Sequence, residues 1–123
     1  MVVAVAAWVT LAVVIISQPF STPKLPIATA NGTYANDCCG TILLRNGQMT
    51  VLSQQVSYVV ERDKIGAYVL PTFYVGPTPR GIVFRRESFP LKMRLDGEAA
   101  PTAIQLMSYD DGSVFSFHRV SGN

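Results

Sequence analysis

Hydrophobic and polar residues follow two different patterns along this chain, and the change falls near Asn31. Residues 1–16 are apolar except for Thr10, and no Lys, Arg, Asp or Glu occurs before Lys24. A helix on the surface of a soluble domain carries polar residues along one face, at a period of about 3.6 residues. Because this segment has no polar face, the pattern predicts a helix that lies in lipid or passes through the translocation machinery.

Residues 1–20 are therefore expected to form a membrane anchor or a signal segment. A spanning helix needs about 20 residues, and the run reaches that length only with Ser17, Gln18 and Pro19 included. A cleaved signal has a shorter apolar core with a small-residue site close behind it, but Ala28-Thr29-Ala30 lies well beyond the run. We favour a retained anchor, with cleavage and secretion as the alternative.

The side of the membrane on which the domain lies is less strongly indicated. Lys24 alone follows the apolar run, and the positive-inside rule would place it in the cytoplasm. The segment nevertheless stands where export signals stand, so we expect an extracytoplasmic domain. Residues 21–30, rich in proline, are expected to form an extended linker. An ordered arm lying on the domain is the alternative.

From Asn31 onward, apolar and polar residues alternate. In 91–95, Leu, Met and Leu alternate with Lys and Arg, and similar runs recur downstream of Asn31. Successive side chains of a strand point to opposite faces, so this alternation predicts half-buried strands. The expected strands are about 32–36, 40–45, 48–53, 55–61, 66–75 (which Pro71 could interrupt), 81–86, 90–95, 102–108 and 113–120.

Turn sequences separate these strands. Asn46-Gly47 is a strong hairpin signal, and Asp96-Gly97 and Asp111-Gly112 mark further turns. About eight short strands with short connections predict an antiparallel meander that must bury one face. The predicted fold is a small all-β domain at 31–123, closed into a barrel or folded into a sandwich.

Composition and charge narrow the classes of function. The chain has 123 residues, ten basic and eight acidic, for a formal net charge of +2. A nucleic-acid-binding domain usually shows a strongly basic face, so no nucleic-acid partner is expected. One histidine and two adjacent cysteines supply too few ligands for zinc, and no sequence motif indicates another cofactor.

The adjacent cysteines, Cys38 and Cys39, are the redox candidates. Neighbouring cysteines cannot close a loop of useful length; they form a strained vicinal ring, pair with another chain, or stay reduced. Cys39 with His118 is the one conceivable thiol dyad, because the chain has a single histidine. No spacing or motif joins the two, so an enzyme is not expected.

A basic set is the candidate binding patch. Pairing across a turn at 87–90 would set Phe84 opposite Met93 and Arg85 opposite Lys92. Like charges directly opposite destabilise a sheet, so an acidic side chain of the same chain or an anionic partner would offset them. A lipid headgroup, a glycan or a protein would be that partner; a solvated row protecting a sheet edge is the alternative. The set is Arg80, Arg85, Arg86, Lys92 and Arg94.

These patterns together favour a non-enzymatic accessory of the cell envelope, in which an anchored β domain binds a partner or supports an assembly. The abundant aromatic residues leave an alternative, a barrel that carries or senses a small apolar ligand in its interior. A thiol enzyme using Cys39 and His118 is the third hypothesis.

Overall fold

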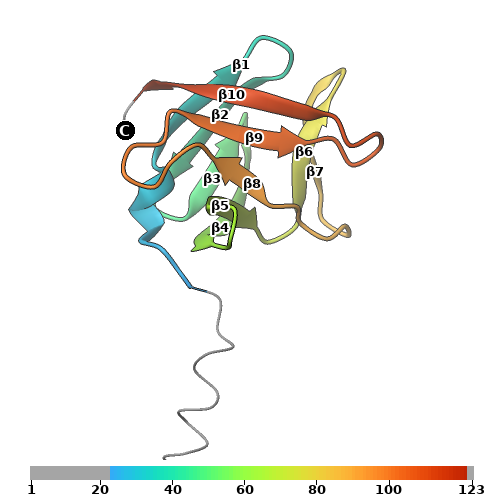
Figure 1. Ribbon diagram of the computed structural model, residues 1–123. Coiled ribbons are helices and arrows are strands. Elements are labelled where there is room, and N and C mark those ends of the chain that lie inside the picture. Colours follow the sequence, from blue (N-terminus) through green and yellow to red (C-terminus); the bar gives the residue numbers. More distant parts are fainter. Residues whose placement is uncertain (1–22, 122–123) are drawn as a thin grey trace, which may run out of the picture.

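The computed structural model describes residues 23–121, which form ten strands and a short helix (Figure 1). The predicted anchor or signal segment, residues 1–20, lies outside the described residues. The elements are η2 (Ile27–Ala30), β1 (Gly32–Asn36), β2 (Gly40–Arg45), β3 (Gln48–Val51), β4 (Gln54–Arg62), β5 (Ala67–Pro71), β6 (Tyr74–Thr78), β7 (Gly81–Arg85), β8 (Met93–Leu95), β9 (Ala103–Met107) and β10 (Val114–Ser121).

Eight of the strands close into an antiparallel barrel in the order β1-β10-β9-β8-β5-β4-β3-β2. Every barrel strand pairs with its neighbours in this order, and β10 returns to β1, with Tyr34 opposite Arg119. The prediction of an all-β antiparallel meander is confirmed, and closure identifies it as a barrel. Closure leaves no unpaired edge strand in this sheet.

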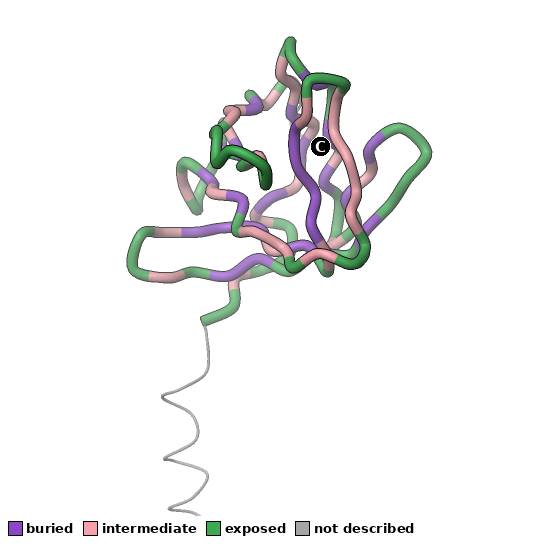
Figure 2. The backbone as a smooth tube through the Cα atoms, turned by 90° about the vertical axis from the view of Figure 1, so that its right-hand side faces the viewer, coloured by how far each residue is buried: buried purple, intermediate pink, exposed green. Residues whose placement is uncertain are grey.

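The alternation in the sequence becomes the inside and outside of this barrel. Figure 2 shows buried stretches along the strands and exposed residues at the turns. Large side chains fill the interior, and those with relative exposures of 0–1% include Tyr34, Ile42, Leu44, Met49, Val69, Met93, Ile104, Leu106 and Phe117.

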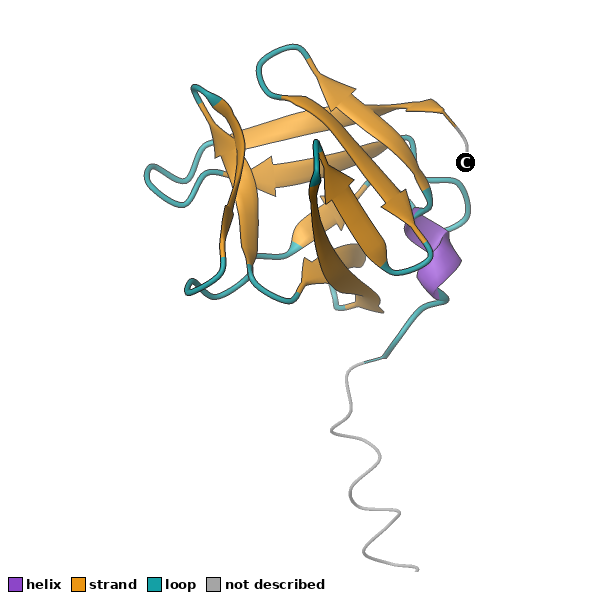
Figure 3. Ribbon diagram, turned by 180° about the vertical axis from the view of Figure 1, so that it is seen from behind, coloured by secondary structure: helices purple, strands orange, loops and turns teal. Residues whose placement is uncertain are grey.

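The expected strand 66–75 is two strands, because β5 ends at Pro71. The chain then forms the β6–β7 hairpin, a separate two-stranded sheet beside the barrel (Figure 3). Tyr74 fixes β6 to β9 by donating a hydrogen bond from its hydroxyl to the Met107 carbonyl, at 2.8 Å.

The predicted pairing of 81–86 with 90–95 is wrong. Phe84 lies opposite Val75, and Met93 lies opposite Val69. Strand β7 takes β6 as its partner across a tight turn, so β8 is free to complete the barrel between β5 and β9.

An antiparallel barrel of consecutive strands places its connections alternately at two ends. The first described residues run along the end of β4, where the Leu25 amide donates to the Val60 carbonyl and the Arg62 amide donates to the Pro23 carbonyl. We call this the N-terminal end; its connections are 46–47, 63–66 and 96–102, and those of the opposite end are 37–39, 52–53, 72–92 and 108–113.

Within residues 23–121, no helix has the length and apolar character needed to cross a membrane.

Candidate functional site

A pocket of about 340 Å³ lies at the opposite end of the barrel from Pro23. Three separate connections form its walls: the β1–β2 loop, the tip of the β6–β7 hairpin and the β9–β10 loop. We call it the disulfide pocket. Its lining residues are Cys38, Cys39, Pro77, Thr78, Pro79, Ser108, Asp111 and Phe115.

The β1–β2 loop contributes a disulfide between Cys38 and Cys39. Cys38 is exposed and Cys39 is buried, with its Sγ 4.0 Å from the Thr78 carbonyl oxygen. A disulfide sulfur carries no proton, so this is a packing contact across the pocket rather than a hydrogen bond. The vicinal ring, one of the three states expected from the sequence, therefore presents an apolar and polarizable surface to the pocket.

Asn36 holds this loop in place. Its side-chain amide donates to the Ser116 carbonyl of β10 at 2.6 Å, and its Oδ1 accepts the Cys38 amide at 2.7 Å. The Cys39 amide donates to the Asn36 carbonyl at 3.1 Å. Asn36 therefore links the disulfide to the barrel wall, because its side chain and its carbonyl accept the cysteine amides while its side-chain amide donates to β10.

The other two walls are fixed in a similar way. In the hairpin, the Thr78 hydroxyl donates to the Gly81 carbonyl at 2.8 Å. In the β9–β10 loop, the Ser108 amide donates to the Ser113 carbonyl at 2.7 Å, and the Ser113 amide donates to Asp111 Oδ1 at 2.9 Å. These bonds set the shape of the pocket without any ligand.

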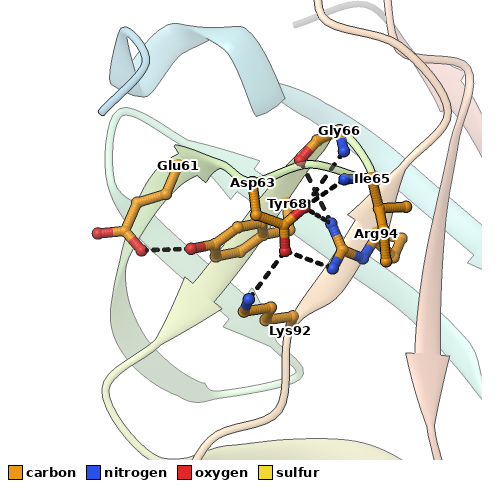
Figure 4. Close-up of polar contacts among 7 residues, drawn as sticks. All are labelled: Glu61, Asp63, Ile65, Gly66, Tyr68, Lys92 and Arg94. Atoms are coloured by element: carbon orange, nitrogen blue, oxygen red, sulfur yellow. Dashed lines mark hydrogen bonds and ion pairs between the residues drawn. The ribbon is translucent and has the colours of Figure 1, made fainter. Parts of the chain in front are cut away.

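A second arrangement, the Asp63 cluster, lies at the N-terminal end (Figure 4). Arg94 donates to both carboxylate oxygens of Asp63, at 2.7 and 2.6 Å, and Lys92 Nζ donates to Oδ2 at 2.8 Å. The amides of Ile65 and Gly66 donate to Oδ1 at 3.0 and 3.2 Å. One carboxylate thus fixes the β4–β5 turn and joins it to β8.

Tyr68 packs against the cations of this cluster. Lys92 Nζ lies 4.6 Å and Arg94 Cζ lies 5.2 Å from its ring centroid. Its hydroxyl donates to Glu61 at 2.8 Å, and Lys24 donates to the other oxygen of Glu61 at 2.9 Å. Glu61 is buried, and a buried carboxylate is tolerated when it is paired and hydrogen-bonded in this way.

The same contacts shift the pKa values of the acidic groups. Arg94, and after it Lys92, hold the pKa of Asp63 well below its ordinary value. Lys24 lowers the pKa of Glu61. Burial, together with the hydrogen bond to Glu61, raises the pKa of Tyr68 to about 12. At neutral pH the two carboxylates are therefore charged and the phenol is neutral.

The structure does not gather the predicted basic set into one row. Lys92 and Arg94 form ion pairs with Asp63, so for these two cations an acidic side chain of the same chain, one of the two expected alternatives, is present. A guanidinium nitrogen of Arg85 lies 3.4 Å from Asp110 Oδ1, and Arg85 Cζ lies 5.8 Å from the Tyr74 ring centroid.

The other two members lie near the β6–β7 hairpin. Arg86 lies over the Phe73 ring at 5.0 Å, and Arg80 is exposed at the hairpin tip. Arg85 and Arg86 also line a second, more open pocket of about 460 Å³. The separation follows from the pairing of β7 with β6, which carries Arg85 away from Lys92.

The proposed thiol dyad lacks its nucleophile in this state, because Cys39 is oxidised in the disulfide. His118 lies on β10 opposite Ala35 and Ala103, and no hydrogen bond joins it to Cys39 within the described residues.

Sequence reasoning missed two features of these sites. The first is the Asp63 cluster, because no local pattern around Asp63 shows that Lys92 and Arg94 would reach it. Cys39, Thr78 and Ser108 lie in the β1–β2 loop, at the end of β6 and in the β9–β10 loop, so their meeting at one pocket depends on the tertiary fold. Asp63-Lys64-Ile65-Gly66 did carry one local signal, an aspartate that accepts the turn amides two and three residues ahead.

Comparisons of the chain with protein-family models, with curated proteins and with solved structures found no match.

Proposed function

We propose that this protein is a non-enzymatic binding domain of the cell envelope, held at a membrane by its N-terminal segment, with the disulfide pocket as its ligand site. The observation that carries the proposal is the position of the pocket. It lies at the end of the barrel opposite Pro23, so a domain anchored through residues 1–20 would present the pocket away from the bilayer.

The oxidised state of Cys38 and Cys39 supports an extracytoplasmic location for the domain. Disulfides persist in oxidising compartments and are rare in the cytosol. The Cys38–Cys39 disulfide, together with the uncharged segment before Lys24, fits a domain that has crossed a membrane.

Binding at the pocket is favoured over carriage inside the barrel. The interior is occupied by side chains such as Leu44 and Phe117, both with a relative exposure of 0%. Small-molecule sites are usually about 300–1,000 Å³ and largely pre-formed, and the disulfide pocket, at about 340 Å³, meets both conditions.

The lining residues suggest the chemistry of the ligand. The disulfide, Pro77, Pro79 and Phe115 are apolar, whereas Ser108 and Asp111 are polar members of the lining. A small molecule with one apolar face and a hydrogen-bond donor at its edge would satisfy both.

Location is tested by fractionation and protease accessibility of the full-length chain in intact cells. The proposal expects the chain in the membrane fraction, with the barrel digested by protease added from outside. Digestion of the barrel only after the cells are permeabilised would contradict the proposed extracytoplasmic location.

Binding is tested by thermal shift of the full-length chain in nanodiscs, with neutral aromatic and monosaccharide fragments as probes. A fragment at 100 times its Kd stabilises the folded state by about 2.7 kcal/mol. Ser108→Trp should fill the pocket and abolish the rise in Tm. Ser53→Trp, on the exposed β3–β4 turn, should retain it.

Three outcomes count against the pocket as the ligand site. Either no fragment raises the Tm of the wild-type chain, or the rise is the same in Ser108→Trp, or Ser53→Trp abolishes it as well.

A further inference from the structure

Ile65 lies at the tip of the β4–β5 turn, and its relative exposure is 80%. A single exposed apolar residue is ordinary on a protein surface. Its surroundings distinguish Ile65, because several hydrogen bonds and ion pairs hold the turn that carries it.

Asp63 accepts five hydrogen bonds at this turn, two of them from the amides of Ile65 and Gly66 and three from the cations of Arg94 and Lys92. Arg94 also donates to the Gly66 carbonyl at 3.3 Å. Figure 4 shows these hydrogen bonds. The conformation of the turn is therefore fixed, while the Ile65 side chain is exposed to solvent. A rigid turn loses little conformational entropy when its tip enters another phase.

Positive charge surrounds the turn. The residues joined by ion pairs at this end, with Lys64 added, are Lys24, Arg62, Lys64, Lys92 and Arg94 against Glu61, Asp63 and Glu98. These are five basic and three acidic residues, a surplus of two positive charges. Lys64, next to Ile65, is exposed and has no ion pair among the described residues.

The turn also lies where the described chain begins. The Arg62 amide donates to the Pro23 carbonyl, and Arg62 directly precedes Asp63. The apolar run ends at Ile16, so residues 17–22 separate it from Pro23. Six residues span at most about 20 Å when fully extended. A bilayer that holds the apolar run is therefore within reach of the turn.

We propose that the 63–66 turn is a second membrane contact, in which Ile65 enters the boundary between headgroups and acyl chains while Lys64 and its neighbours face anionic lipid phosphates. An apolar tip flanked by basic residues is the combination that binds anionic bilayer surfaces. The inference rests on the proposed anchoring, and it adds an orientation: the N-terminal end lies against the lipid and the disulfide pocket faces away.

The test uses the full-length chain in vesicles of phosphatidylcholine with phosphatidylglycerol. Because Cys38 and Cys39 are paired, Ile65→Cys introduces a single free thiol for an environment-sensitive fluorophore. The matched control is Leu52→Cys, which is 94% exposed at the opposite end of the barrel. We expect a blue shift and a roughly twofold rise in emission at position 65, by transfer of the probe from water into the interface, and no change at position 52.

A charge variant separates lipid electrostatics from simple proximity. Lys64→Glu in the Ile65→Cys background should reduce the emission change in anionic vesicles towards the value in pure phosphatidylcholine. Unchanged emission in this variant would contradict the role of the basic residues.

Failure of the inference is distinguishable from failure of the anchoring. A chain that floats with the vesicles but shows no emission change at position 65, or an equal change at 65 and 52, overturns the contact and leaves the anchor in place. A chain that does not float with vesicles of either composition contradicts the anchor itself, and the inference with it.

Discussion

The Asp63 carboxylate and the Arg94 guanidinium meet in two parallel hydrogen bonds of 2.7 and 2.6 Å, across 31 positions of sequence. This two-point geometry is stronger and more directional than a contact between single charges. It joins the β4–β5 turn to β8, a strand of three residues. Such a short strand has few ladder hydrogen bonds, and the ion pair adds a further link to those bonds and to the burial of Met93 and Leu95.

Asp63→Asn is expected to lower the Tm at neutral pH, because the amide cannot match both the Arg94 fork and Lys92. The pKa of Asp63 is lowered in the folded state, chiefly by Arg94, so its contribution is complete above the ordinary value of 3.8. It is lost progressively as the pH falls below that value. The difference between wild type and variant, measured by denaturant unfolding, should therefore shrink in acid.

Asp37→Asn is the control for this series, since Asp37 is exposed in the β1–β2 loop and forms no ion pair among the described residues. An Asp63→Asn chain that unfolds at the wild-type temperature at neutral pH would show that the cluster contributes nothing to stability.

Tyr68→Phe removes the hydroxyl that donates to Glu61 at 2.8 Å. Hydrogen bonds to charged groups contribute about 1.5–3 kcal/mol, and we expect a destabilisation in that range at pH 7. The exposed Tyr109→Phe should change stability by less than about 0.5 kcal/mol because its ring contact with Tyr74 is retained.

The same substitution changes how the free energy of unfolding depends on pH in alkaline solution. An unfolded tyrosine ionises near its ordinary pKa of 10.0, whereas folded Tyr68 keeps its proton to about 12. The stabilisation is thus present below pH 10 and is lost as the pH rises from 10 to 12. Tyrosinate absorbance should show one group fewer titrating near 12 in the variant; an unchanged titration curve would contradict the assignment.

Gly76→Ala tests how closely β6 packs on β9. A Cβ at this position would overlap the ring and hydroxyl of Tyr74 and approach the Met107 carbonyl to 3.0 Å. The hydroxyl would then lose its bonds to Met107 and to the Tyr109 amide, and overpacking of this kind costs about 1–3 kcal/mol. Gly97→Ala, with open space around its Cβ, is the matched control and should be neutral. Equal stabilities of the two variants, measured by thermal unfolding, would disprove the close approach.

Phe117→Ala tests whether the barrel interior is filled. Phe117 has a relative exposure of 0%, and truncation of a buried phenylalanine costs about 3–5 kcal/mol. Val120→Ala on the same strand, 65% exposed, should change stability little. A loss below about 1 kcal/mol for Phe117→Ala would point to a loosely packed interior with room for a ligand, as the carrier hypothesis requires. Urea denaturation gives both values.

Local pattern was enough to place most of the strands and the hairpin turn at Asn46-Gly47, but not the pairing of β7. The alternation around Met93 and the Asn46-Gly47 turn depend on residues that are neighbours in sequence, and the ranges 32–36 and 40–45 coincide with β1 and β2. The interruption that Pro71 allowed in the expected strand 66–75 is present, and β5 ends at this residue, since proline has no amide hydrogen to donate to a further ladder bond.

The sequence by itself determined that a two-faced pleated chain begins after Asn31, since the period of two is a property of adjacent residues. Only the tertiary structure decided that β7 returns to β6, that β8 closes the barrel between β5 and β9, and that Asp63 meets Arg94. The contacts of β8 and of Asp63 join positions far apart in the chain, whereas the β6–β7 hairpin is one of two local pairings open to β7. In each case the choice depends on the free energy of the whole closed sheet. The walls of the disulfide pocket meet for the same reason, because closure brings three distant connections to one end of the barrel.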